Sequence, residues 1–88
     1  KKTILMTDKQ TTLDKLNAGD YCRIISYSDD SIASKLISMG VFPNAEGFLL
    51  DTNHKKHTFF LIVGSLKLGL LYNEAASIIV HKIENNGE

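Results

Sequence analysis

The stretch Asp29–Asn44, DDSIASKLISMGVFPN, decides how the chain folds. At spacings of four and three, its apolar residues fall on one face of a helix: Ile32, Leu36 and Met39. We expect this helix over Ser31–Met39, with a cap supplied by one of the residues Asp29–Ser31. Gly40 stands where a helix needs a residue with positive φ to end, and Pro43-Asn44 predicts a β-turn. The pattern predicts a short amphipathic helix that ends in a tight turn and buries its apolar face.

Around this helix the chain consists of short apolar segments bounded by turn residues, which are typical of β-strands. Five strands are predicted: Tyr21–Tyr27, Glu46–Thr52, Thr58–Val63, Leu66–Leu71 and Ser77–Ile83. Thr11–Leu16 predicts a helical turn that points Leu13 and Leu16 inward, and Asn73 is expected to cap another turn at Glu74–Ala76. Closing five strands into a small β-barrel removes exposed edges, so we expect a barrel with the helix across one open end.

Length and composition indicate one domain over residues 11–84, with an N-terminal arm or added edge strand at 1–10 and a frayed tail at 85–88. Apolar residues make up 43% of the 88, which favours a folded chain. Ten basic and ten acidic residues leave no basic surplus for nucleic acid. No apolar run is long enough for membrane insertion. The single cysteine excludes an internal disulfide and favours a cytoplasmic setting.

Four short motifs follow one another in a fixed order: Leu13-x-x-Leu16-x-x-Gly19-Asp20, Arg23-Ile24, Leu36-x-x-Met39-Gly40-Val41-x-Pro43 and Ala75-x-x-Ile78-x-Val80. This order resembles the FeoA family, small cytosolic proteins of bacterial ferrous iron transport. It is also similar to the C-terminal domain of DtxR-type metal-dependent repressors. The likeness runs from about Thr11 to Ile83. It implies an SH3-like five-stranded barrel, no catalytic activity, and a partner in FeoB, the membrane GTPase transporter.

The chain departs from the family in two turns and one strand. Pro43-Asn44 replaces the usual Pro-Gly, and Gly69-Leu70 replaces a common Ala-Leu pair. The segment NHKKH at 53–57 stands where a Gly-Asp-Pro turn is frequent. Asn tolerates positive φ, so the fold is expected to be kept, while nothing known of the family's loop carries over to 53–57.

The weak candidates for a metal site are His54 and His57, in that probable hairpin loop. A ferrous or zinc site needs three or four converging ligands, and the two intervening lysines would repel a cation. His81 and Cys22 lie on separate predicted strands, and Cys22 falls in step with Ile24 as a core residue. We therefore expect a solvated loop, no resident metal and no cofactor, with ferrous iron only the ion that the system transports. No nucleophile-elbow, Walker or dinucleotide motif occurs, so no enzyme is predicted.

The strongest functional signal is an excess of apolar residues. Thr58–Val63, TFFLIV, does not alternate, although a strand of a one-layer barrel has one exposed face. Either Phe59, Leu61 and Val63 or Phe60 and Ile62 must point outward, and Phe48–Leu50 raises the same question. The cover for this face is the N-terminal arm, the central helix, a partner protein or a second copy. The partner-binding candidates are Phe48, Leu50, Phe59, Phe60, Leu61, Val41 and Phe42.

The sequence thus favours a non-enzymatic accessory or regulatory protein of ferrous iron uptake that binds cytosolic regions of FeoB. One alternative is a regulatory SH3-like domain of the metal-dependent repressor type. Another is a cytosolic iron carrier that would use His54, His57, His81 or Cys22. Self-association would satisfy the same apolar surface as a transporter partner.

Overall fold

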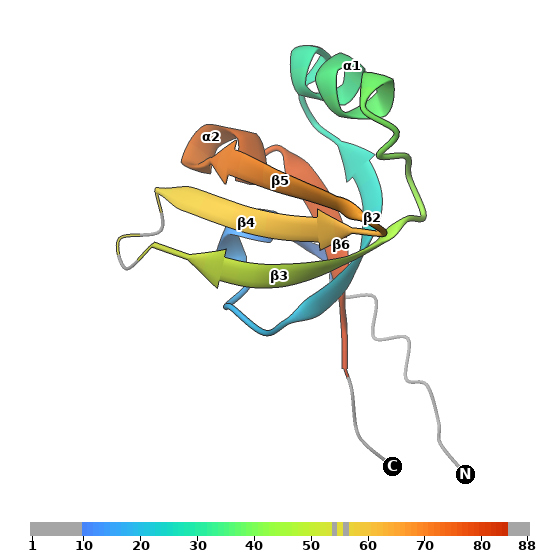
Figure 1. Cartoon of the computed structure of the whole chain (residues 1–88). Coiled ribbons are helices and arrows are strands. Elements are labelled where there is room, and N and C mark those ends of the chain that lie inside the picture. Colours follow the sequence, from blue (N-terminus) through green and yellow to red (C-terminus); the bar gives the residue numbers. More distant parts are fainter. Residues whose placement is uncertain (1–9, 54, 56, 85–88) are drawn as a thin grey trace, which may run out of the picture.

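The computed structural model describes residues 10–53, 55 and 57–84, and Figure 1 shows how they are arranged. Within these residues nine elements follow in order: β1 (Gln10–Thr12), η1 (Leu13–Lys15), β2 (Tyr21–Tyr27), α1 (Asp30–Ser38), β3 (Glu46–Thr52), β4 (Thr58–Val63), β5 (Leu66–Leu71), α2 (Tyr72–Ala75) and β6 (Ile78–Ile83). The strands form one antiparallel sheet in the order β1-β6-β2-β3-β4-β5. The arm residues 1–9 and the tail 85–88 lie outside the described residues.

The five expected strands are present, four of them with the expected bounds, while β6 begins one residue later than expected. The prediction of a closed five-stranded barrel is wrong in two respects. Gln10–Thr12 adds a sixth strand, β1, on the free edge of β6. Within the described part of the chain, the sheet also stays open between β5 and β1. Each edge strand runs into a helical turn, and these turns, α2 and η1, contact each other where a closed barrel would have a strand ladder.

The sheet is curved (Figure 1), and the buried side chains of the core lie inside this curve. Among the described residues the core holds fourteen buried apolar ones: Leu13, Leu16, Cys22, Ile24, Leu36, Val41, Leu49, Phe59, Leu61, Leu68, Leu70, Ala75, Ile78 and Val80. In β4, Phe59 and Leu61 are fully buried, which settles the register that TFFLIV left open. A register shift between Leu49 and Asp51 makes Leu50 an extra residue, so Asp51 avoids the inward position that strict alternation would give it.

Helix α1 begins and ends one residue earlier than expected, at Asp30 and Ser38, and its cap is one of the three expected residues. Asp29 is the N-cap, and its Oδ1 accepts hydrogen bonds from the N–H groups of Ser31 (2.8 Å) and Ile32 (3.2 Å). At the C-terminal end Gly40 has φ +93°, and Val41 N–H donates to the Leu36 carbonyl at 2.9 Å. These are the features of a Schellman motif, which satisfies the last carbonyls of a helix.

The expected burial of Met39 is wrong: this side chain is 42% exposed, whereas Leu36 is buried and Ile32 is half-buried. The reason is the position of α1 beyond the end of β2, where the helix contacts the sheet only on a narrow stripe (Figure 1). Met39 is already the C-cap residue and leaves that stripe. The β-turn is confirmed: Asn44 has φ +80°, and Ala45 N–H donates to the Phe42 carbonyl at 3.1 Å.

The expected cap of the second helical turn is also wrong. Helix α2 starts at Tyr72, so its N-cap is Leu71 and not Asn73. The strand passes into the helix without an intervening turn, and a carboxylate satisfies the first free amide: Glu74 Oε1 accepts a hydrogen bond from Leu71 N–H at 2.9 Å.

Candidate functional site

The convex face of the sheet carries a row of apolar side chains that crosses four strands. The register places Tyr21 opposite both Ile83 and Phe48, and Phe48 opposite Ile62. The rings of Tyr21 and Phe48 are 4.7 Å apart between centroids and tilted by 47°. Tyr21 is 45% exposed and the other three side chains are half-buried. We call these four residues the outer row.

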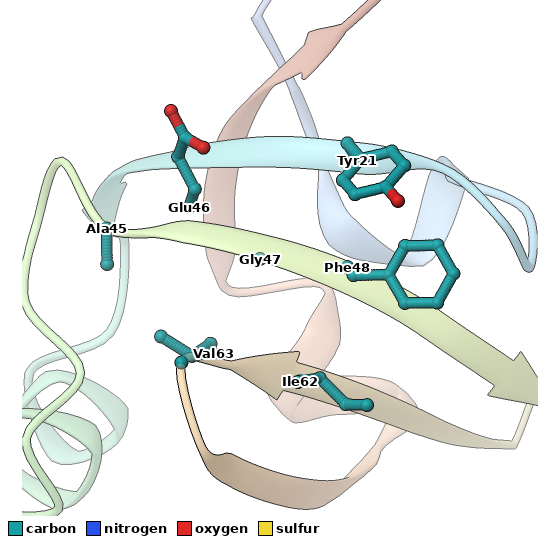
Figure 2. Close-up of a pocket in the computed structure, with 8 residues that line it drawn as sticks. Tyr21, Ala45, Glu46, Gly47, Phe48, Ile62 and Val63 are labelled. Carbon is teal, nitrogen blue, oxygen red and sulfur yellow. The ribbon is translucent and has the colours of Figure 1, made fainter. Parts of the chain in front are cut away.

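A groove opens beside the outer row because β3 and β4 diverge. Their pairing ends at Phe48 and Ile62, and beyond that point β3 pairs only with β2. Figure 2 shows the result: Ala45 and Val63 lie at one end of the groove, and Phe48 and Ile62 at the other. Tyr21, Glu46, Gly47 and Gly64 complete the lining. The groove is therefore a shallow, open and mainly apolar depression.

One charged pair borders the groove. Glu46 Oε2 accepts a hydrogen bond from Arg23 Nη2 at 2.9 Å, and both side chains are well exposed. His81 lies opposite Arg23 on the neighbouring strand, and its Nε2 is buried without a hydrogen-bond partner in the described residues. The polar rim therefore lies on the β6 side of the groove, next to apolar walls.

Phe60 extends the apolar face along β4 and has its own structural role. Gly69 lies directly opposite on β5. A Cβ added to Gly69 would lie 3.6 Å from Cε1 of the Phe60 ring, so the ring packs over the bare glycine backbone. This cover leaves Phe60 half-buried although it points away from the core.

The seven partner-binding candidates divide into three groups. Val41, Phe59 and Leu61 are fully buried in the core, so they do not lie on any surface. Phe48 and Phe60 are half-buried on the convex face. Leu50 and Phe42 are 41% and 53% exposed, Leu50 at the β3 bulge and Phe42 in the turn after α1. The structure therefore brings only part of the set to one face.

The candidates omitted Tyr21, Ile62 and Ile83, which belong to the outer row. The sequence does predict the outward direction of Tyr21. Neighbouring side chains of a strand point to opposite faces, so Tyr21 must point away from Cys22 and Ile24. The pairing of Tyr21 with Phe48 and Ile83 could not be predicted from the sequence, because residues far apart in the chain meet only through the register of the sheet.

The metal candidates do not converge in the described part of the chain. No group of three or more His, Cys, Asp or Glu side chains there could hold an ion. His54 lies outside the described residues, and His57 is exposed, with its N–H donating to Asn53 Oδ1 at 2.7 Å. Cys22 is fully buried, and this burial raises the pKa of its thiol to about 11. Cys22 is thus a core residue, as its alternation predicted.

A salt bridge ties α1 to α2. Lys35 Nζ lies 2.6 Å from Glu74 Oε2, and the Glu74 side chain is only 12% exposed. The hydrogen bond from Lys35, and then that from Leu71 N–H, lowers the pKa of the Glu74 carboxyl. A single carboxylate therefore holds α1 over α2 and caps the N-terminus of α2.

We expect Glu74→Gln to lower the free energy of unfolding at neutral pH by up to about 1 kcal/mol, since solvent screens the pair. Because folding depresses this pKa, the stabilisation is present above the usual value of 4.5 and is lost as the pH falls through the folded-state pKa. The free energies of unfolding of the wild type and of Glu74→Gln, measured by urea denaturation, should therefore become equal at acid pH. Glu46→Gln, at the exposed pair with Arg23, is the control and should cost less. If the difference in stability between the wild type and Glu74→Gln stayed the same at acid pH, the ionised Glu74 carboxylate would not be its source.

Several solved structures resemble this chain, although no family model and no curated protein matches it. An FeoA-like protein from Clostridium acetobutylicum has a TM-score of 0.79 and 17% identity, covering 91% of this chain and 94% of its own. A zinc complex of Stenotrophomonas maltophilia FeoA, described as a prokaryotic SH3 domain protein, has a TM-score of 0.72 and 22% identity, covering 81% and 89%. A manganese-dependent transcriptional repressor has a TM-score of 0.75 and 18% identity, covering 85% of this chain but 42% of its own.

These likenesses define the class of fold, a small mainly-β domain of the SH3 type. Within that class, the chain has the FeoA-like SH3-type fold. The resemblance drawn from the four sequence motifs is thereby confirmed at the level of fold. No helix in the described residues is long and apolar enough to cross a membrane.

Proposed function

We propose that this protein is a non-enzymatic accessory protein of bacterial ferrous iron uptake, and that it acts on the cytoplasmic side by binding an FeoB-type transporter. The observation that carries the proposal is the outer row with its groove, an apolar surface on a domain whose core is already complete. Large apolar patches with a polar rim are typical of protein-docking sites. The FeoA-like fold supports the choice of partner, since the S. maltophilia protein is described as a possible ferrous iron transport activating factor.

The mechanism would be differential binding. A protein without catalytic groups changes the activity of its partner only when it binds two states of that partner with different affinity. An extended or helical segment of the transporter would lie in the groove against Phe48 and Ile62, with Arg23 and Glu46 on the rim. Contact with one transporter state would then shift the transporter toward that state.

The test is a binding measurement with the cytosolic domain of the transporter. Phe48→Asp should weaken binding by about 30-fold or more, because truncating a central apolar anchor costs at least about 2 kcal/mol. Phe48 is a better site than Phe60, because an aspartate at 60 would stand opposite Asp51 and disturb folding by like-charge repulsion. Ile37→Asp, at a 40% exposed position on α1, is the matched control and should bind like the wild type.

Circular dichroism must first show that both variants fold. Unchanged affinity of folded Phe48→Asp would remove the groove as the docking site. An anaerobic ferrous iron titration addresses the carrier alternative: one tight ion per chain, lost in the His54→Ala/His57→Ala double variant, would favour iron carriage over contact regulation.

A second candidate is a regulatory domain of a metal-dependent repressor, and one observation favours it. The manganese-dependent repressor has a TM-score of 0.75, within the range of the FeoA structures. The same binding measurement separates the two functions, because a repressor-type domain would bind a DNA-binding partner domain and leave the transporter domain unbound.

A further inference from the structure

Within the residues that the structure describes, β5 is the longer edge strand of the sheet, with six residues against three in β1. It pairs with β4 without a register shift, from Val63 opposite Leu66 to Thr58 opposite Leu71. A two-residue turn makes the first pair hydrogen-bonded, and bonded pairs then alternate along an antiparallel ladder. The main-chain groups of the intervening residues on β5 therefore point away from β4: Lys67, Gly69 and Leu71.

These outward main-chain groups are only partly satisfied. Leu71 N–H donates to Glu74 Oε1. The N–H groups of Lys67 and Gly69 have no acceptor among the residues that the structure describes. The edge also lacks the usual protection against pairing, since it contains no proline and no bulge and has Lys67 as its one charged residue. It is open to the addition of another strand.

We propose that β5 pairs antiparallel with β5 of a second copy of this chain, about a two-fold axis beside Gly69. This register brings all three outward residues into the new ladder. Gly69 exchanges both hydrogen bonds with Gly69 of the second copy, and Lys67 lies opposite Leu71, whose N–H already bonds Glu74 and whose carbonyl serves α2 as its N-cap. An axis at Lys67 would instead place two ammonium groups opposite each other, which is unfavourable. Of these two registers, the one about Gly69 is therefore favoured.

The side chains fit this arrangement. Leu71 is 58% exposed, and in the dimer it lies against the aliphatic stem of Lys67 from the other chain. Gly69 has no side chain to separate the two strands at the axis, and the Phe60 ring beside it flanks the contact. The pairing therefore covers apolar area that the monomer leaves in water.

This interface goes beyond the proposed contact with the transporter, because it uses the edge of the sheet and not its groove. Pairing through β5 makes the two sheets continuous and leaves Phe48 and Ile62 of both copies open. The dimer would present two docking faces to a partner. Its test is therefore independent of the partner's identity.

The test is sedimentation over a concentration series from micromolar to millimolar. Wild type should change from monomer to dimer, whereas Gly69→Glu should stay monomeric, since it places two carboxylates opposite each other at the axis. The monomer accommodates a side chain at 69, because a Cβ there makes only ordinary contact with Phe60. Ser34→Glu, at an exposed position on α1, is the matched control and should dimerise normally. A monomeric wild type, a dimeric Gly69→Glu, or species larger than a dimer would each overturn the proposal.

A cross-linking measurement reads the register and does not depend on the glutamate variant folding. With a mild oxidant, Gly69→Cys should form a disulfide-linked dimer, because residue 69 lies opposite itself at a spacing of about 5.5 Å. Lys67→Cys should not link to itself, since its copies are about 13 Å apart along the strands. The buried thiol of Cys22 gives little background. Equal linking of both variants, or none of Gly69→Cys, would reject this register.

Discussion

Phe59→Ala should lower the free energy of unfolding by about 3–5 kcal/mol, whereas Phe60→Ala, one residue further along, should cost about 1 kcal/mol. Phe59 is the largest fully buried side chain, so its truncation removes apolar contacts and leaves a cavity. Phe60 points to the convex face and loses only its packing over Gly69. For a small domain, the first change removes a large part of the total stability.

Urea denaturation of the two variants measures this difference directly. Both variants replace a phenylalanine of the same strand by alanine, so each is the control for the other. Similar m-values would show that both variants unfold from a comparable native state. If Phe60→Ala costs as much as Phe59→Ala, then the register of β4 is wrong, and the composition of the outer row is wrong with it.

Leu36→Ala should cost about 2–5 kcal/mol, because Leu36 is the one residue of α1 that is fully buried. Its side chain fixes the helix to the core, and its carbonyl accepts the hydrogen bond from Val41 that closes the helix end. Met39→Ala is the control, at the exposed C-cap position, and should change the stability by less than about 1 kcal/mol. Thermal and urea melts of both variants check the prediction. Equal costs would mean that α1 packs on a wider face than the structure shows.

Local signals in the sequence were sufficient for α1 and for the strands β2 to β5. Asp29, Gly40 and Asn44 each have a backbone or capping preference that acts within a few residues, so the turn and, to within one residue, the limits of α1 followed from them. Strand bounds were predictable for the same reason, since apolar runs are interrupted by turn residues such as Gly64-Ser65. Alternation with Ile24 also placed Cys22 in the core.

Tertiary structure alone decided which side of each apolar strand is buried. TFFLIV is apolar on both faces, so its periodicity could not choose between Phe59 and Phe60; the pairing of β4 with β3 and β5 made the choice. The outer row depends on contacts between residues that are 14 to 62 positions apart, which no local preference encodes. Likewise, the exposure of Met39 and the open edge at β5 depend on where whole elements lie, because burial is a property of the assembled sheet and not of a segment.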